Sequence, residues 1–265
     1  MARALALLGA VALVGALSST TRRALLRGAP AAALTGATTR ATAADEENVA
    51  VYFGVGCFWH VQHEFAEAER AILGRDAFQW TARAGYAGGR KAGKDASRPG
   101  QSLVCYHNPQ RIADYGKLGH GEVVGLKVPP STVGKFAEAY AALFDSGGDR
   151  PDKGDRGGEY RSLVGLPGGE SSPLAGVVAK ALEGKGLKLA RGSGDDGDTL
   201  GTGKVWLYDT AAFPFYQAEV YHQFHSNFFP SEGMPYPRSY TDELYRLKIS
   251  LGELPNTGCP GGEHY

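Results

Sequence analysis

Cysteine is scarce in this chain of 265 residues, and apolar runs long enough to span a membrane are missing. The three cysteines, Cys57, Cys105 and Cys259, are too few and too far apart for a disulfide scaffold, and no two of them form a Cys-x-x-Cys pair. Hydrophobic residues make up 43% of the chain, which is enough for a packed core, while the mean hydropathy is -0.26. These features exclude a polytopic membrane protein and indicate a globular domain whose cysteines carry thiol chemistry.

Net charge is also missing, because 28 Lys and Arg residues balance 28 Asp and Glu residues. The two signs are unevenly placed. Residues 1–44 contain five arginines and no acid, which leaves 23 basic and 28 acidic residues, a net charge of -5, for residues 45–265. Because the larger part has no basic field, we expect neither nucleic acid nor a membrane as a partner of the mature chain.

The first residues are typical of a targeting address. Ala4–Leu17 is an apolar run of 14 residues, too short for a spanning helix, and residues 18–44 are rich in Ala, Thr and Arg. We expect a two-part signal for a plastid reached through the secretory route, with a plain secretory signal or a mitochondrial presequence as alternatives. The predicted organisation is a targeting segment over residues 1–44, a catalytic domain over 45–230 and a C-terminal extension over 231–265.

The rest of the chain alternates between strand-like and helix-like patterns. Apolar alternation predicts strands over 48–55, 78–84, 122–128, 160–166 and 204–208, and apolar steps of three and four predict helices over 58–72, 132–144 (N-capped by Ser131), 174–182 and 218–228. Gly-rich stretches predict loops over 93–101, 147–158 and 184–203. This interleaving predicts an α+β fold, a two-layer ferredoxin-like α/β sandwich with a mixed sheet and long surface loops.

Cys57 follows the first predicted strand and precedes the first predicted helix. Unpaired N–H groups at a helix start favour a thiolate, so this position suits a nucleophile. The alternative is a small buried apolar residue at a strand end. Phe58 and Trp59 follow directly, and two adjacent aromatic side chains point in different directions, so at least one is expected to border the thiol. Such a wall would receive a methyl or thioether group, although both rings could instead belong to the core.

A thiolate that attacks an electron-poor centre needs a group that protonates the departing oxygen. Glu122 precedes two valines on a predicted apolar strand, where a carboxyl group without a partner would keep its proton. Tyr86, Asp155 and Tyr160 lie beside glycine-rich turns and are further candidates. The alternatives are an edge-strand glutamate facing water, two ordinary strand-end tyrosines and a turn aspartate.

Five motifs, in this order, resemble those of the A-type peptide methionine sulfoxide reductases. The resemblance covers roughly residues 49–229, and the first motif is the most specific. The motifs are Gly-Cys-Phe-Trp at 56–59, Gly-Tyr-Ala-Gly-Gly at 85–89, Gly-His-Gly-Glu-Val-Val at 119–124, Asp-Arg-Gly-Gly-Glu-Tyr-Arg-Ser at 155–162 and Ala-Glu-Val-Tyr-His-Gln at 218–223.

The resemblance implies reduction of methionine-S-sulfoxide, free or in proteins, through a sulfenic acid on the nucleophile. It implies the following roles: Cys57 as nucleophile, Glu122 as the acid on the sulfoxide oxygen, Phe58 and Trp59 as walls for the substrate methyl, Tyr86 and Tyr160 as hydrogen-bond donors, and Asp155 as an orienting group that acts through water. His60 and Gln62 depart from the family pattern, which has glycine and glutamate there, and this puts substrate preference and rate in doubt.

Recycling of the sulfenic acid is also implied by the resemblance. Family members commonly use a cysteine near the C-terminus, whose disulfide is then opened by thioredoxin, and Cys259 lies between glycines near the end of this chain. Cys105 is the rival resolving cysteine, but its apolar surroundings favour a buried inert thiol. We expect no cofactor and no metal, an external reductant such as thioredoxin or dithiothreitol, oxidised proteins or free methionine sulfoxide as partners, and a monomer.

Two other classes of function remain as alternatives. His222 could serve as the base of a cysteine–histidine hydrolase, although nothing near Cys57 resembles a protease nucleophile turn. A histidine-based metal site is the second alternative, since the pairs His60/His63 and His222/His225 are each spaced by three residues on predicted helices. Such pairs are more often part of a solvated helix face.

Overall fold

A computed structural model describes residues 46–94, 99–225 and 238–261. The chain divides into two units, residues 1–40 and 41–265, and the description below concerns the second. The expected targeting segment over residues 1–44 lies outside the described residues, as does the expected boundary near residue 230. In the part of the chain that is described, no helix has the length and apolar character needed to cross a bilayer.

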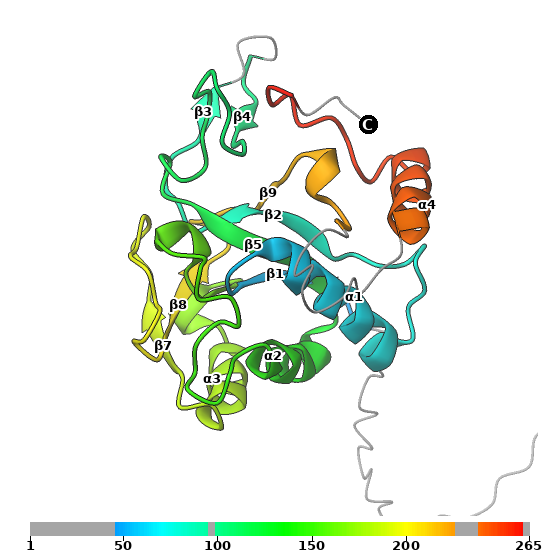
Figure 1. The fold of residues 1–265 in the computed structure, drawn as a ribbon. Helices are drawn as coiled ribbons and strands as arrows, with labels where there is room; N and C mark the ends of the chain where they lie inside the picture. The colour runs from blue at the N-terminus through cyan, green and yellow to red at the C-terminus, as the bar shows by residue number, and fades with distance from the viewer. Residues whose placement is uncertain (1–45, 95–98, 226–237, 262–265) are drawn as a thin grey trace, which may run out of the picture. The chain divides into compact units, whose positions relative to one another are not determined.

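A seven-stranded mixed sheet forms the centre of the fold, in the order β7-β8-β6-β1-β5-β2-β9 (Figure 1). The pairs of β1 with β5 and β6, and of β2 with β5 and β9, are antiparallel, while β8 runs parallel to β6 and β7. The strands are β1 (Val49–Gly54), β2 (Arg83–Ala87), β5 (Gly121–Val128), β6 (Leu163–Leu166), β7 (Lys188–Arg191), β8 (Lys204–Asp209) and β9 (Tyr216–Gln217). A separate two-stranded sheet pairs β3 (Gly93–Lys94) with β4 (Ser102–Leu103).

Four α-helices lie in the described part of the chain, and three of them follow the sequence prediction closely. They are α1 (Phe58–Leu73), α2 (Val133–Ala142), α3 (Ala175–Glu183) and α4 (Arg238–Ser250), joined by 3-10 turns at Pro130–Thr132, Gly158–Tyr160, Gly169–Ser171 and Val220–His222. Together with the mixed sheet they confirm the predicted α+β class.

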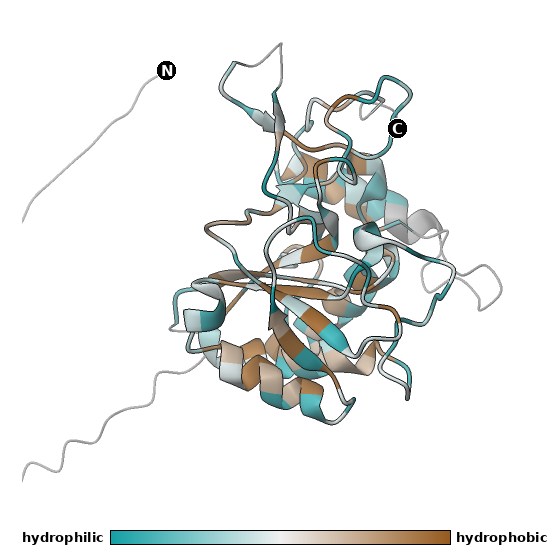
Figure 2. Ribbon diagram, turned by 90° about the vertical axis from the view of Figure 1, so that its left-hand side faces the viewer, coloured by the Kyte–Doolittle hydropathy of each residue, from teal (hydrophilic) through white to brown (hydrophobic). Residues whose placement is uncertain are grey.

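Alternation along the strands separates two hydrophobic layers. Val51, Phe53 and Val124 face the layer that contains α1, α2 and α3 and form the main core with side chains of these helices. Tyr52 and Val123 are adjacent to these residues in the chain and face the opposite layer. Figure 2 shows how hydrophobic residues concentrate on the strands between these layers. Residues at even positions of β5, which include Glu122, therefore point toward the helices.

The predicted strand over 78–84 is shifted in the structure. β2 begins only at Arg83, and residues 77–79 form a turn in which Phe78 is 61% exposed. The Asp76 side chain accepts the N–H of Phe78 at 3.0 Å, and its carbonyl accepts the N–H groups of Gln79 and Trp80. An aspartate that accepts the N–H groups of the residues after it favours a turn over a strand. This explains why the strand begins later than the sequence predicts.

The predicted helix over 218–228 is wrong for the residues that are described. Only a 3-10 turn, Val220–His222, forms there, and residues 226–228 lie outside the described part. The Gln223 side chain donates to the carbonyls of Ala84 and Ala218, at 2.9 and 3.0 Å, and accepts the N–H of Ala84. In a helix, the carbonyl of Ala218 would accept the N–H of His222. Here the buried side-chain amide of Gln223 occupies this carbonyl, so the segment packs against β2 and does not form a helix.

Four further elements differ from the sequence prediction. β6 begins at Leu163, so the expected strand over 160–166 is shortened and Tyr160 lies in a 3-10 turn. β7 lies inside the predicted loop 184–203, and α4 lies inside the predicted extension 231–265. Helix α2 begins at Val133 after a 3-10 turn, and Ser131 is not its N-cap. The Thr132 hydroxyl donates to the Pro129 carbonyl at 2.8 Å, which stabilises that turn.

Candidate active site

The thiol of Cys57 lies at the junction between β1 and α1. Helix α1 begins at Phe58, with Cys57 as its N-cap in an extended conformation, as the sequence predicts. Gly56 has a φ of 68°, a conformation that favours glycine, and its N–H donates to the carbonyl of Tyr160 at 3.1 Å. Cys57 is the free cysteine of the chain and is half-buried.

Burial raises the pKa of the Cys57 thiol well above its usual range, and the neighbouring charge of Glu122 raises it further. The N–H groups of Trp59 and His60 lower this pKa, but their effect is smaller. The helix start thus favours a thiolate, as expected, but the effect of burial is larger. Cys57 rests as a thiol and becomes nucleophilic when its proton is taken up elsewhere in the site.

Glu122 lies at the start of β5 in the middle of the sheet and is 2% exposed. Its Oε2 accepts the N–H of Phe58 at 2.9 Å, and its Oε1 accepts the hydroxyl of Tyr115 at 3.2 Å. Burial raises the pKa of Glu122 to about 8, against the smaller opposing effect of these donors. The raised pKa favours the protonated carboxyl group that the sequence predicts, whose role as an acid stays a prediction. The alternative of an edge-strand glutamate facing water is wrong.

Tyr115 is a site residue that the sequence analysis missed. It is fully buried, and its ring stacks on Tyr86 and Tyr106 with centroid distances of 4.6 and 5.8 Å. Burial and the charge of Glu122 raise its pKa, so its hydroxyl remains a donor. Tyr115 belongs to no periodic apolar pattern that would predict its burial. Its closeness in the chain to Glu122, seven residues later, is the local feature that could have suggested a role.

Tyr86 lies directly opposite Glu122 in the pairing of β2 with β5. Its side chain is fully buried, and its hydroxyl donates to Oε2 of Glu219 at 2.8 Å. This hydroxyl is therefore already engaged with a different carboxyl group. Its expected role as a hydrogen-bond donor to a substrate stays a prediction.

Tyr160 and Tyr106 are half-buried and come from two different loops. Burial and the charge of Glu122 raise the pKa of both, that of Tyr106 to about 12, and Cys57 contributes to both increases. Both phenols are thus protonated donors within electrostatic reach of Cys57 and Glu122. Tyr106, like Tyr115, was not singled out from the sequence.

Asp155 is half-buried and lies near Cys57. Burial raises its pKa, while Arg150 and the N–H of Cys57 lower it. Its Oδ2 is buried and has no hydrogen-bond partner. A cavity of about 10 Å³, about the size of one water molecule, is lined by Asp155, Cys57, His60 and Arg150.

The two predicted aromatic walls are unequally exposed. Phe58 is 1% exposed and packs in the main core against Tyr86 and His222. Trp59 is half-buried, its Nε1 donates to Nδ1 of His222 at 3.2 Å, and His225 stacks on it at a centroid distance of 3.8 Å. Trp59 is therefore the ring with surface left to meet a substrate, and Phe58 supports it from the core.

Gln62, one of the departures from the family pattern, has a structural role. Its side chain is buried and donates to the carbonyl of Ala82 and to Oε1 of Gln223, at 3.2 and 3.1 Å. It also accepts the N–H of Phe224. Gln62 thus connects α1 to the segment that follows β9. His60, the other departure, lines the small cavity beside Cys57.

The histidine alternatives gain no support from the geometry. Burial lowers the pKa of His222 to about 3, so this ring is a poor base for a hydrolase, and its Nδ1 already accepts from Trp59. Among the described residues, His60, His63, His222 and His225 do not converge on a metal-binding position.

Two other groups of potential ligands do converge. In one group the carboxyl group of Glu219 lies beside Cys105 and Cys259, whose sulfurs are bonded to each other. In the other, His107 lies between Asp114 and Glu159, with N–O distances of 3.0 and 3.5 Å.

Cys105 and Cys259 form a disulfide, with 5.6 Å between their Cα atoms. The expectation that Cys105 is an inert buried thiol is therefore wrong. Both candidates for resolving Cys57 are joined in one bond. The apolar pattern around Cys105 predicts its burial, but it cannot identify a partner 154 residues away.

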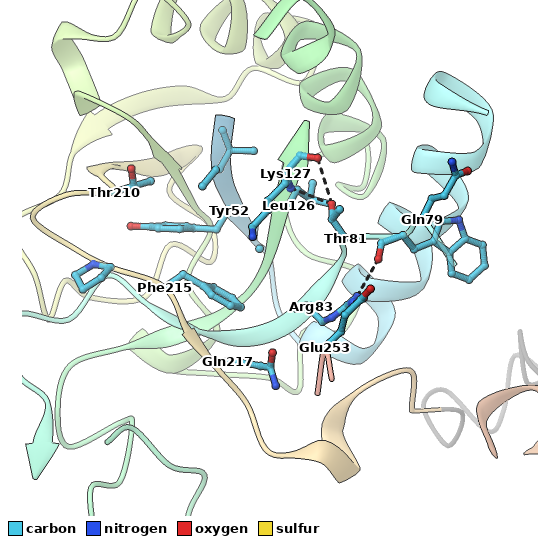
Figure 3. A pocket seen from close by; sticks show the side chains of 15 residues that line it. Tyr52, Gln79, Thr81, Arg83, Leu126, Lys127, Thr210, Phe215, Gln217 and Glu253 are labelled. Atoms are coloured by element: carbon cyan, nitrogen blue, oxygen red, sulfur yellow. Dashed lines mark hydrogen bonds and ion pairs between the residues drawn. The ribbon is translucent and has the colours of Figure 1, made fainter. Parts of the chain in front are cut away.

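A larger cavity, of about 730 Å³, lies on the opposite face of the sheet. Figure 3 shows Tyr52, Lys127 and Phe215 along it, with the ion pair of Arg83 and Glu253 at one side. None of the residues predicted for the active site lines this cavity. It is therefore separate from the chemistry around Cys57.

No family model and no curated protein matches the chain. Among solved structures, it is similar to Mxr1 from Saccharomyces cerevisiae in reduced form, with 19% identity, a TM-score of 0.41, and coverage of 69% of this chain and 87% of that one. It is also similar to methionine sulfoxide reductase A of Corynebacterium diphtheriae, with 22% identity, a TM-score of 0.38, and coverage of 72% and 79%.

Proposed function

We propose that this chain is a peptide-methionine (S)-S-oxide reductase, which reduces methionine-S-sulfoxide, free or in proteins, to methionine. The observation that carries the proposal is the pairing of a free thiol at the start of α1 with a buried carboxyl group whose pKa is about 8. Glu122 accepts the N–H of Phe58, the residue next to Cys57, so the acid is fixed beside the nucleophile.

In the proposed first step, the sulfur of Cys57 attacks the sulfoxide sulfur while Glu122 protonates the oxygen. The hydroxyl group then passes to the sulfur of Cys57, which becomes a sulfenic acid, and methionine leaves. The proton of the Cys57 thiol replaces the one that Glu122 gives up, so the protons balance. The raised pKa values of both groups suit this exchange, because a negative charge on one disfavours a charge on the other.

The remaining residues bind and orient the substrate in this proposal. Trp59 receives the methyl group, supported by Phe58 from the core. Tyr160 and Tyr106 keep their protons at neutral pH and donate hydrogen bonds to the sulfoxide oxygen. Asp155 acts through water in the small cavity beside Cys57.

Recycling proceeds through the Cys105–Cys259 pair and an external dithiol, without a cofactor. Once the pair is reduced, the Cys259 thiol attacks the sulfenic acid of Cys57 and releases water. Cys105 then displaces Cys57, which leaves the Cys105–Cys259 disulfide that is present here. Thioredoxin or dithiothreitol reduces this disulfide. We further propose that the chain acts as a monomer in an organelle, a plastid above all, on oxidised proteins or free methionine sulfoxide.

The test is the rate of methionine release from each resolved epimer of methionine sulfoxide, free and within a peptide, with thioredoxin as the reductant and a chelator present. We expect turnover of the S epimer alone and no effect of the chelator. Failure to reduce either epimer would overturn the proposal, as a cysteine–histidine hydrolase predicts. Loss of activity with the chelator would instead favour a metal-dependent protein.

A further inference from the structure

Glu219 places a second buried carboxyl group beside the disulfide. One of its oxygens and the sulfurs of Cys105 and Cys259 all lie within 4.8 Å of one another. Glu219 is 3% exposed and directly precedes the 3-10 turn Val220–His222. Nothing in the chemistry proposed for Cys57 uses this carboxyl group.

Two donors hold the carboxyl group of Glu219 in place. Its Oε1 accepts the N–H of Tyr106 at 2.8 Å, and its Oε2 accepts the hydroxyl of Tyr86 at 2.8 Å. Because Tyr106 follows Cys105 in the chain, the first bond fixes the carboxyl group relative to the disulfide. Nε2 of His222 lies 4.0 Å from Oε2.

Among the residues that the structure describes, the groups that contact Glu219 are uncharged at neutral pH. Tyr86 on β2 is a neutral phenol, since its pKa is raised. Burial lowers the pKa of His222, in the adjoining turn, to about 3. Cys105 and Cys259 are bonded to each other and do not titrate. Burial raises the pKa of Glu219 itself, against the smaller effect of its hydrogen-bond donors, so the carboxyl group retains its proton to a higher pH than an exposed glutamate does.

We propose that Glu219 is the acid that protonates the sulfur released when the Cys105–Cys259 disulfide is reduced. This proposal rests on the recycling by a dithiol described above. A thiolate of the dithiol attacks one sulfur of the disulfide, the S–S bond breaks, and the other sulfur leaves with the electron pair and takes the proton of Glu219. The second thiol of the reductant then attacks the reductant's own sulfur in the mixed disulfide, and the other protein sulfur leaves as a thiolate that takes a proton from solvent. The proton of the second thiol restores the carboxyl group.

The positions of the two cysteines in the chain favour attack on Cys259. Both residues are buried, but Cys259 lies on the last described segment, whereas Cys105 directly precedes Tyr106, whose N–H holds Glu219. Attack on Cys259 releases Cys105, the cysteine adjacent to the N–H group that holds Glu219. The leaving sulfur thus remains next to the acid, and the attacked sulfur moves away with the C-terminal segment.

The test measures how fast dithiothreitol reduces the disulfide of the full chain, by trapping the new thiols with iodoacetamide over time and determining their number by mass spectrometry. The rate is divided by the concentration of dithiothreitol thiolate at each pH. In the wild-type chain this corrected rate should be constant at low pH and fall as pH rises through the pKa of Glu219. Glu219→Gln should lower the low-pH rate by about tenfold or more and remove the fall.

Glu69→Gln is the matched control, because Glu69 is fully buried and accepts several hydrogen bonds at the other end of α1. It should leave the reduction rate and its pH dependence unchanged. If Glu69→Gln slows the reaction as much as Glu219→Gln does, the effect is general loosening of the fold, and the proposal is overturned.

Tyr86→Phe keeps the carboxyl group and removes one donor to it. Because this hydrogen bond lowers the pKa of Glu219, the fall in the corrected rate should move to higher pH while the low-pH rate is kept. A purely structural glutamate predicts no such movement, and an unmoved profile would overturn the proposal even if Glu219→Gln does not fold.

The outcome is independent of the proposed function, because the assay contains no sulfoxide. A chain that shows the Glu219 dependence but releases no methionine sustains this inference and refutes the proposed function. If the wild-type chain releases methionine but Glu219→Gln leaves the rate of disulfide reduction unchanged, the proposed function is sustained and this inference is refuted.

Discussion

The molecule contains two sulfur centres, and each has a buried glutamate beside it. At one centre Glu122 accompanies the free thiol of Cys57, and at the other Glu219 accompanies the disulfide of Cys105 and Cys259. Each carboxyl group accepts one backbone N–H and one tyrosine hydroxyl, and burial raises the pKa of each. The same set of groups thus accompanies both the free thiol and the disulfide.

The two centres differ in the element that holds the acid. Glu122 lies on β5, an interior strand between β1 and β2, and it pairs directly with Tyr86 of β2. Glu219 lies between the edge strand β9 and a 3-10 turn. Asp155 and Glu159 add negative charge around Glu122 and raise its pKa further. One carboxyl group thus lies on an interior strand and the other beside an edge strand, and burial is the main cause of the raised pKa of both.

Cys57→Ser should have the largest effect, since it removes the sulfur that reacts with the substrate. We expect methionine formation to be abolished, while dithiothreitol still reduces the Cys105–Cys259 disulfide at the wild-type rate. Methionine release and thiol trapping measure the two effects. Cys105→Ser is the counterpart: after full reduction it should still form one methionine per chain but should turn over slowly with thioredoxin. Full activity in Cys57→Ser would end the hypothesis.

The second prediction concerns stability. The folded pKa of Glu122, about 8, is above its ordinary value of 4.5, so the stabilisation from its neutral form is present below pH 4.5 and is lost as pH rises to about 8. Glu122→Gln carries no such charge. Relative to wild type, its free energy of unfolding should therefore increase by about 5 kcal/mol across this interval. Urea denaturation at several pH values measures the free energy of unfolding of both proteins. If the two free energies change with pH in parallel, the pKa of Glu122 does not change on folding and the prediction is wrong.

Glu122→Gln should also slow the reaction, by roughly a hundredfold to a thousandfold, because an amide cannot protonate the sulfoxide oxygen. In the wild type, the single-turnover rate of the reduced chain should fall as pH rises through about 8, where the carboxyl group loses its proton. The variant should lack this fall. A wild-type rate that still increases above this pH would assign the acid to another group.

The smallest effect is expected from Tyr115→Phe, the counterpart of Tyr86→Phe at the other centre. The Tyr115 hydroxyl lowers the pKa of Glu122, so its removal should move the fall in single-turnover rate to higher pH by up to about one unit, with a change in rate of a few-fold. The pH profile of disulfide reduction should stay in place. A shift of both profiles would mean that the two centres are coupled through their stacked tyrosines.

The sequence predicts well what depends on neighbouring residues. The position of Cys57 follows from an alternating pattern that changes to a helical one, and the burial of Glu122 follows from the valines after it. Both patterns reflect the period of a single element, which a short window contains. The helices 132–144 and 174–182 are predicted for the same reason, to within one or two residues at each end.

What the sequence does not predict depends on distant partners. Tyr86 is an evident candidate in its glycine-rich motif, yet its hydroxyl bonds to Glu219, 133 residues away. The failed helix prediction after residue 218 has a similar cause, because Gln223 bonds to Ala84, 139 residues away. Such contacts follow from the order of strands in the sheet, which periodicity does not encode.

The disulfide also makes a covalent ring of the chain between Cys105 and Cys259, a separation of 154 residues. Closing a ring of this size restricts the unfolded chain by about 5 kcal/mol in the chain-entropy account. Cys57 lies outside the ring, whereas both glutamates lie within it. Each proposed catalytic cycle would therefore open and close the ring, and the reduced form that is ready to react is the one that heat unfolds more easily.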